Sequence, residues 1–367
     1  MSDDSKESTV DRPSRGTARL TVRYALVFVI VAVVLGLFGY AGGWLTPSAL
    51  TPLRMIDAFE QVNGPHPGFR RNHAKGVCFT GYFDSNGNGV ELSKASVFIA
   101  GHVPVLGRFA LAGGQPYQAD APHMVRSMAI LFRLRSGEEW RTGMNNIPVF
   151  AVNTPQAFYE QLLASVPDPT TGKPDPQKIR DFLAKNPASA KAIELIRSAP
   201  VSSGFDDSTF NSLDTFRFIN ADGKTTFVRW SMTPLRPFEP AGTAQPARTN
   251  PNYLFDELIE SVRQGPLRWY LMITVGQPGD PTNDPTLPWP PDRQQVNVGT
   301  LTIDHIDSED ISLARDINFD PLVLPNGIAS SDDPLLSARS AAYAQSFTRR
   351  EGEKKDHSAV STGEASK

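Results

Sequence analysis

Eight short runs of apolar, aromatic and β-branched residues, separated by turn residues, dominate the middle of this 367-residue chain. About eight strands are enough to close a small barrel. The segment Asn220-Ala221-Asp222-Gly223 lies between two of the runs and is typical of a hairpin turn, in which glycine supplies a positive φ, so neighbouring strands are expected to be antiparallel. The expected strands are residues 77–83, 95–100, 106–112, 127–134, 215–220, 225–230, 268–275 and 298–305.

Helices are expected to interrupt these strands and to follow them. Three pairs of an N-capping residue and a proline, a combination typical of helix starts, fall between the fourth and fifth runs. The pairs are Thr154-Pro155, Asp175-Pro176 and Asn186-Pro187. Apolar residues at helical spacing predict a further helix over residues 253–264, and Asp333-Pro334 opens another. The expected fold class is therefore α+β, a closed antiparallel β-barrel of about eight strands with a helical insertion.

An uncharged apolar segment, residues 24–45, precedes the barrel and is long enough to cross a membrane as one helix. Arginines precede it and the first charge after it is Arg54, so the positive-inside bias places the N-terminus in the cytoplasm and the rest of the chain outside. Gly39-Tyr40-Ala41 offers small residues to a signal peptidase, and a cleaved signal peptide with a soluble periplasmic product is the alternative. We favour an uncleaved anchor because the apolar run continues past that point. Both interpretations export the domain to the periplasm or cell exterior.

The remaining composition defines the organisation of the chain and excludes some functions. We expect a disordered cytoplasmic arm (1–23), the transmembrane anchor (24–45), a connector (46–68), a folded domain (69–350) and a disordered tail (351–367). A net charge of −3 argues against a nucleic-acid partner, because binding phosphates requires a basic face. The single cysteine, Cys78, excludes an intrachain disulfide and a multi-thiolate metal site.

Two segments that lie far apart in the sequence carry most of the functional information. The first contains His73-Ala74-Lys75-Gly76 and, within the strand that follows, Gly81-x-Phe83. The second contains Arg339 and Tyr343, which are four residues apart on an expected helix and therefore emerge on one face. Taken alone, a histidine is usually a structural or surface residue, and Arg-x-x-x-Tyr is an ordinary exposed helix pair.

Together the two segments resemble the distal histidine segment and the proximal Arg-x-x-x-Tyr helix of the haem catalases. A third segment, Gly143-Met144-Asn145-Asn146-Ile147-Pro148-Val149-Phe150, resembles the family's Gly-Asn-Asn-x-Pro-x-Phe segment with Met144 inserted. Alignment on Pro148 makes Asn145 the catalytic amide, whereas without His73 the Asn-Asn pair would be interpreted as a loop or turn. The resemblance covers roughly residues 69–350 and implies the catalase-like barrel.

The resemblance implies a role for each residue of these segments. His73 would act as the base that carries a proton between the two oxygens of peroxide. Asn145 would hydrogen-bond the oxygen that becomes negative, a contribution of typically ~3 kcal/mol. Tyr343 would be the axial haem iron ligand, as in haem catalases, with Arg339 helping to offset the roughly 4 kcal/mol that ionising a free tyrosine costs at pH 7. Phe158 would lie over the haem plane, although core packing explains a lone phenylalanine equally well.

Three arginines match positions at which the family binds the haem propionates, for which guanidinium groups are suited. They are Arg70, Arg108 and Arg350, and each could instead be a surface arginine. Ala110 stands where catalases usually have a serine hydroxyl that orients the distal imidazole, so His73 is expected to be held less firmly. Because little sequence follows Tyr343, the chain resembles the minimal, catalase-related peroxidases, which rely more on organic reductants.

The function implied is a haem-dependent peroxidase that reduces hydrogen peroxide or organic hydroperoxides with an unidentified organic electron donor, in defence against peroxide and with weak catalase activity. The expected cofactor is haem of the b type. The expected partners are hydrogen peroxide, the electron donor and the membrane, through the N-terminal helix, and no nucleic acid. Two alternatives stay open: a lipid hydroperoxide isomerase or dehydratase on the same fold, and a barrel that only binds haem.

Overall fold

The computed structural model describes residues 15–42, 49–242 and 250–363, which fall into two compact units, Met1–Thr51 and Pro52–Lys367. The first unit contains helix α1 (Arg15–Ala41). Within it, Val22–Tyr40 is apolar enough and long enough to cross a membrane, and its large apolar side chains are exposed. A signal sequence has the same length and composition, so this helix fits both interpretations of the N-terminus. Most of the arm predicted over residues 1–23 lies outside the described residues.

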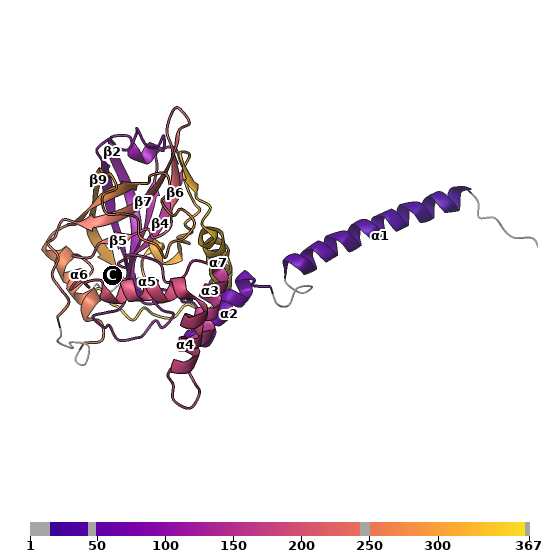
Figure 1. Ribbon diagram of the computed structural model, residues 1–367, viewed down its shortest axis with the longest axis horizontal. Coiled ribbons are helices and arrows are strands. Elements are labelled where there is room, and N and C mark those ends of the chain that lie inside the picture. Colours follow the sequence, from indigo (N-terminus) through magenta and orange to yellow (C-terminus); the bar gives the residue numbers. More distant parts are fainter. Residues whose placement is uncertain (1–14, 43–48, 243–249, 364–367) are drawn as a thin grey trace, which may run out of the picture. The chain divides into compact units, whose positions relative to one another are not determined.

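Eight antiparallel strands close a barrel in the second unit, which confirms the expected fold class (Figure 1). The order around the barrel is β7-β5-β4-β3-β2-β1-β9-β8, and β8 pairs with β7 to complete the ring. The barrel strands are β1 (Gly76–Ser85), β2 (Gly101–Leu111), β3 (Arg126–Arg133), β4 (Glu139–Asn145), β5 (Phe210–Asn211), β7 (Thr225–Pro234), β8 (Leu267–Val275) and β9 (Gln295–Asp307). Two short strands, β6 (Phe216–Ile219) and β10 (Ile328–Ser330), extend the sheet beyond β7.

Six of the predicted runs are barrel strands, and the run 215–220 is β6, which pairs with β7 beside the barrel. The prediction of a strand over residues 95–100 is wrong, because Ser96–Phe98 forms a 3₁₀ turn. Val97 and Phe98 are apolar because they enter the core and not because they pair in a sheet. Strand β4 was not expected, since charged residues alternate along it with the buried ones.

The α-helices described in the second unit are α2 (Pro52–Asn63), α3 (Pro155–Ala164), α4 (Pro176–Lys185), α5 (Pro187–Ser198), α6 (Tyr253–Gln264) and α7 (Pro334–Glu351). Of these, α3, α4, α5 and α7 begin at the proline that follows a predicted capping residue. Thr154, Asp175 and Asp333 each accept a hydrogen bond from a backbone N–H in the first turn, at 3.1, 2.8 and 2.9 Å. Asn186 does not cap α5 in this way, because its side chain donates to the Phe182 carbonyl at the end of α4.

Large aromatic side chains fill the interior of the barrel. Phe132 stacks on Trp140 at 4.8 Å between ring centroids, and Trp140 meets the edge of Trp230 at 5.1 Å. All three are almost completely buried. A barrel of eight strands has room for little beyond such side chains. A ligand site on this fold therefore lies outside the barrel wall, where α2, α3 and α7 pack on one another (Figure 1).

Two segments outside the predicted domain also belong to the second unit. Helix α2, in the expected connector 46–68, buries Met55, Ile56 and Phe59. Beyond α7, residues 352–363 lie along the domain, which differs from the disorder expected over 351–367. Val360 is fully buried there, and the Ser308 hydroxyl donates to its carbonyl at 3.2 Å.

Candidate functional site

A cavity lies between the outer face of the barrel and helices α2, α3 and α7. Successive side chains of a strand point to opposite faces, so residues two positions apart on a barrel strand can face this cavity together. Arg108 and Ala110 of β2, Ser127 and Ala129 of β3, and Gly143 and Asn145 of β4 all face it, whereas the residues between them point into the core. The empty volume is about 1190 Å³, part of which is open to solvent. Pockets for small molecules and cofactors commonly measure ~300–1,000 Å³, so this one can hold a large planar group.

The structure brings every site residue predicted from the sequence to this one cavity. Its lining includes Arg70, His73, Arg108, Asn145, Phe158, Arg339, Tyr343 and Arg350. They come from the loop before β1, from the barrel wall, from α3 and from α7. Residues from both ends of the folded unit thus meet at one place.

His73 is held in a conformation that residues other than glycine rarely adopt. Its φ is +57°, in the left-handed region, which costs of order 1 kcal/mol or more for such a residue. Three contacts fix it: the Asn72 Oδ1 accepts from the His73 backbone N–H at 3.0 Å and from the Gly113 N–H at 2.8 Å, and the Arg108 guanidinium donates to the His73 carbonyl at 2.6 Å. The backbone is therefore fixed around the imidazole.

The imidazole lies at the cavity, where a backbone contact with Leu111 acts on its pKa. Its Nδ1 is buried and has no hydrogen-bond partner among the described residues. Ala110, whose side chain has no hydroxyl group, lines the same cavity as His73. Burial first, and then the positive charges of Arg108, Arg339 and Arg70, lower the pKa of His73 to about 3. At physiological pH the ring is neutral and can accept a proton.

A buried ion pair fixes the segment that carries His73. Lys75 Nζ lies 2.7 Å from Asp120 Oδ1 and also donates to the carbonyls of Gln118 and Pro251 at 2.8 Å each. The second oxygen of Asp120 accepts from the Leu254 backbone N–H at the start of α6. Since all polar atoms of this pair have partners, it is a rigid connection between the His73 loop and the rest of the domain.

Strand β4 brings Asn145 and Gly143 to the cavity. Asn145 is the last residue of β4, pairing with Ser127 and Asn211, and its Oδ1 is buried without a partner in the part of the chain that the structure describes. Gly143 lies two residues earlier on the same face, and a methyl group added there would lie 3.7 Å from the Tyr343 hydroxyl. Met144, the residue inserted between them, points into the core.

On α7, Arg339 lies between Tyr343 and two buried carboxyl groups. Its guanidinium donates to Asp214 in a short ion pair and to the Tyr343 hydroxyl. Burial acts against the charge of Arg339, but the carboxylate of Asp214 and the phenol of Tyr343 raise its pKa. Asp333, the N-cap of α7, lies beside Asp214. A permanently charged guanidinium thus faces the Tyr343 oxygen.

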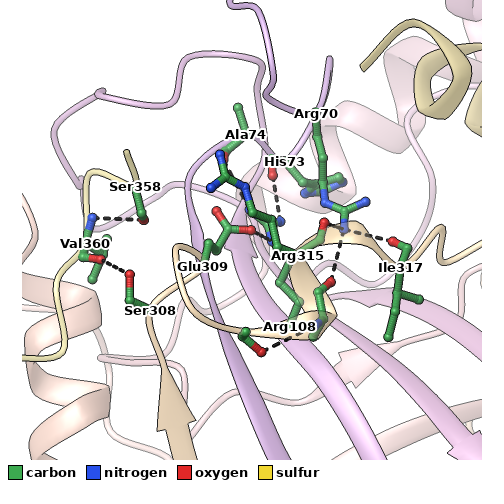
Figure 2. Close-up of polar contacts among 12 residues, drawn as sticks. Arg70, His73, Ala74, Arg108, Ser308, Glu309, Arg315, Ile317, Ser358 and Val360 are labelled. Atoms are coloured by element: carbon green, nitrogen blue, oxygen red, sulfur yellow. Dashed lines mark hydrogen bonds and ion pairs between the residues drawn. The ribbon is translucent and has the colours of Figure 1, made fainter. Parts of the chain in front are cut away.

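Three guanidinium groups and one carboxylate gather at the other end of the cavity. Arg108 donates to Glu309 Oε1 at 2.5 Å, and Figure 2 shows it between Glu309 and the backbone at His73. Arg70 donates to the carbonyls of Arg315 and Ile317 at 2.8 and 2.9 Å (Figure 2). Arg350 donates to the Arg315 carbonyl at 3.1 Å.

This arginine cluster, defined as Arg70, Arg108 and Arg350, fits the two propionates of a haem. With Glu309 it leaves a net charge of +2, which two carboxylates would neutralise. Burial first, and then the charges of Arg350 and Arg108, lower the pKa of Arg70 to about 9, and its Nε is buried without a partner in the described chain. An anion at this position would offset the positive charges that lower the pKa of Arg70 and would accept a hydrogen bond from its Nε–H.

Apolar and aromatic side chains form the rest of the cavity. Phe158 meets the edges of Phe59 and Phe150 at 5.6 and 5.9 Å between ring centroids. Met55 and Ile56 of α2 lie on the same wall. An uncharged ring system with two acidic substituents is the kind of ligand that matches an apolar cavity ending in an arginine cluster.

Sequence reasoning missed the contributions of α2, Glu309, Asp214 and Asp333. Asp333 carried a signal for capping only, and α2 lies in the expected connector 46–68. Glu309 and Asp214 have no local pattern, because their partners are far away in the sequence.

Comparison with known proteins gives a consistent set of relatives. The catalase family model matches residues 44–363. A catalase-related peroxidase of Synechococcus elongatus is 36% identical over 326 residues, which cover 89% of this chain and 95% of that protein. A catalase-related peroxidase of Mycolicibacterium paratuberculosis is 33% identical over 304 residues, covering 83% and 96%. In fold, a fungal catalase structure superposes with a TM-score of 0.71 at 22% identity, and the match covers 81% of this chain and 62% of that one.

Proposed function

This chain belongs to the catalase family, and on that basis we propose that it reduces hydrogen peroxide with an organic electron donor, using a haem of the b type held between the barrel wall and α7. Because its relatives are catalase-related peroxidases, the chain is a peroxidase, that is, an oxidoreductase that acts on peroxide. The observation that supports the residue roles best is that His73 and Tyr343, from opposite ends of the folded unit, line one cavity.

A haem bound in this cavity would supply an iron centre able to exchange the electrons that split the peroxide O–O bond. The arginine cluster would hold its propionates, Tyr343 would ligate its iron through the side-chain oxygen, and Phe158 would pack beside it. The Arg339 guanidinium donates a hydrogen bond to the Tyr343 oxygen and would keep that oxygen in place for the haem.

On the opposite wall, His73 and Asn145 act on the peroxide. The neutral imidazole removes the proton from one peroxide oxygen and delivers it to the other, which leaves as water. The Asn145 side-chain amide donates a hydrogen bond to the oxygen that gains negative charge. Reduction of one H₂O₂ to two waters takes up two protons and two electrons, and two molecules of a phenol-type donor each give up one electron and one proton.

The test is the rate at which the haem-loaded full chain oxidises a phenolic donor with H₂O₂. We expect His73→Ala to lower this rate about 10²–10⁴-fold, the usual contribution of a positioned base, while haem remains bound. His102→Ala is the matched control, because His102 is exposed and pairs with Asp84 away from the cavity. Equal rates for His73→Ala and the wild type would refute the assigned base.

Product analysis separates the proposed reaction from its alternatives. A peroxidase oxidises the donor in proportion to the peroxide consumed, whereas catalase activity releases O₂ without a donor. Rearrangement of a lipid hydroperoxide with no donor oxidised would instead favour an isomerase or dehydratase.

For the location we propose a membrane-anchored protein whose folded unit is outside the cytoplasm. The support is one N-terminal helix that is apolar enough to cross a membrane and that follows several arginines. The mass of the mature protein distinguishes an uncleaved anchor from a cleaved signal peptide. A full-length protein in the membrane fraction, with its C-terminus open to external protease, is the expected result.

A further inference from the structure

Two buried carboxyl groups behind Arg339 lie next to each other. Asp214 is 0% and Asp333 4% exposed. Asp214 Oδ2 accepts from Arg339, and Asp333 Oδ1 accepts from the Leu335 backbone N–H. The other oxygens, Asp214 Oδ1 and Asp333 Oδ2, are buried and lack any partner within the described ranges when both groups are treated as acceptors. Two neighbouring carboxylates that are both ionised and both left unsatisfied in this way would be strongly unfavourable.

We infer that Asp214 and Asp333 share one proton and together act as positioning residues that hold Arg339 against Tyr343. With the proton on Asp333 Oδ2, that hydroxyl donates to Asp214 Oδ1, and both unsatisfied oxygens gain a partner. Asp214 then stays ionised and pairs with Arg339, and Asp333 continues to cap α7 through Oδ1. This Asp214–Asp333 pair goes beyond the proposed function, and only its effect on Tyr343 rests on the proposed ligation.

The charges around the pair favour this distribution of the proton. Burial raises the pKa of Asp214 too, and Arg339 on α7 and Arg229 on β7 oppose that rise. Arg229 also faces Asp333, Asp280 and Asp284, and Arg339 also faces Asp333. The direct ion pair of Arg339 is with Asp214, and we therefore assign the charge to Asp214. Burial first, and then the negative charge of Asp214, raise the pKa of Asp333 from 3.8 to about 7.

The residue directly before Asp214 has an unusual backbone conformation, which indicates that the position of Asp214 is enforced by its surroundings. Leu213 has φ +64°, and within the described residues only His73 shares a positive φ among residues other than glycine. Such a conformation costs energy and persists where the surrounding structure enforces it. The two strained residues therefore stand at the distal base and directly before the proximal pair.

The first experiment uses the full chain without haem, in detergent, and compares infrared spectra at pH 6, where ordinary aspartates with pKa ~3.9 are ionised. We expect the C=O band of one protonated carboxyl group in the wild type that is lost in Asp333→Asn. Asp175→Asn is the matched control, since Asp175 caps α4 in the same Asp-Pro arrangement but is only partly buried. A difference spectrum without loss of this band would overturn the shared proton.

Stability against pH gives an independent reading of the same proton. Because the pKa of Asp333 is raised in the folded state, its contribution is full below pH ~4 and is lost as the pH rises to about 7. The wild type should therefore lose stability relative to Asp333→Asn over that window. Parallel stability curves for the two proteins would contradict the inference.

The second experiment adds haem and measures its affinity by titration. Asp333→Asn keeps a donor for Asp214 Oδ1 and a cap for α7, so we expect haem affinity within about threefold of the wild type. Asp214→Asn removes the anion that holds Arg339, and changes to such outer partners typically lower affinity 10–100-fold. Wild-type affinity in Asp214→Asn would overturn the positioning role. If the wild type itself binds no haem, the proposed function and this role both fail, while the infrared result still decides the shared proton.

Discussion

The two walls of the cavity hold their reactive groups in different ways. On the barrel side, His73 Nδ1 and Asn145 Oδ1 are buried and have no partner among the described residues. On the α7 side, Tyr343 and Arg339 belong to a continuous set of hydrogen bonds and ion pairs that reaches Asp214. The unpartnered atoms on the barrel side are thus available to hydrogen-bond a small substrate. On the α7 side, the hydrogen bonds and ion pairs of Arg339 fix the position of Tyr343.

The difference follows from how each wall is built. Tyr343 and Arg339 are four residues apart on one helix, and the helix alone sets their spacing. His73 and Asn145 come from a loop and a strand end, so they require separate supports such as Asn72, Arg108 and the buried Lys75–Asp120 pair. A change on the α7 side should therefore affect cofactor binding, and a change on the barrel side should affect turnover.

The largest effect is expected from a substitution on the α7 side. Tyr343→Phe keeps the ring and removes only the oxygen, so the fold should persist while the proposed iron ligand is lost. We expect the Fe(III)-phenolate absorption to collapse and peroxidase activity to fall on the order of 10³-fold, as for other groups that act directly on the reaction.

Tyr159→Phe is the control for this substitution, because the Tyr159 hydroxyl contacts Arg54 on α2 and the residue is not part of the cavity lining. It should leave the spectrum unchanged. His73→Ala should show the opposite pattern from Tyr343→Phe, with the spectrum retained and turnover lost. A Tyr343→Phe protein with a normal haem spectrum would show that the two walls do not divide the work in this way.

How far the sequence predicts this site depends on whether a residue carries a local pattern. His73 and Tyr343 lie in contiguous segments, so their types and spacing are visible in the chain. The barrel was predicted from runs of strand-forming residues, but β4 was missed because Glu139 and Arg141 alternate with its buried residues. Glu309 could not be found, since its only signal is a contact with Arg108 across the fold.

An effect of intermediate size is expected at the arginine cluster, where it tests how the cavity binds the haem propionates. Glu309→Gln leaves an oxygen for Arg108 Nε but removes the negative charge, so the net charge there rises from +2 to +3. We expect haem to bind up to about tenfold more tightly at low salt, because its propionates meet less competing negative charge. The protein without haem should lose about 3 kcal/mol, since one charge of a buried pair is left alone.

Titration of haem and chemical unfolding measure these two opposite changes. Glu139→Gln serves as the control, because Glu139 pairs with Arg141 at a more exposed position, where such pairs contribute at most about 1 kcal/mol. Weaker haem binding in Glu309→Gln than in the wild type would mean that Glu309 orients Arg108 for the propionates and does not compete with them.

The smallest expected effect concerns the barrel side alone. Ala110→Ser would add a hydroxyl to the cavity that His73 also lines, and the core beneath β2 stays unchanged; His73 Nδ1 has no partner among the described residues. A hydrogen bond to Nδ1 fixes the ring orientation, and we expect O₂ release from H₂O₂ to rise a few-fold, with haem affinity unchanged. Ala129→Ser adds a hydroxyl to the same wall on β3 and is the control. If Ala110→Ser changed haem affinity and not O₂ release, the free imidazole nitrogen would not be what limits catalase activity in this protein.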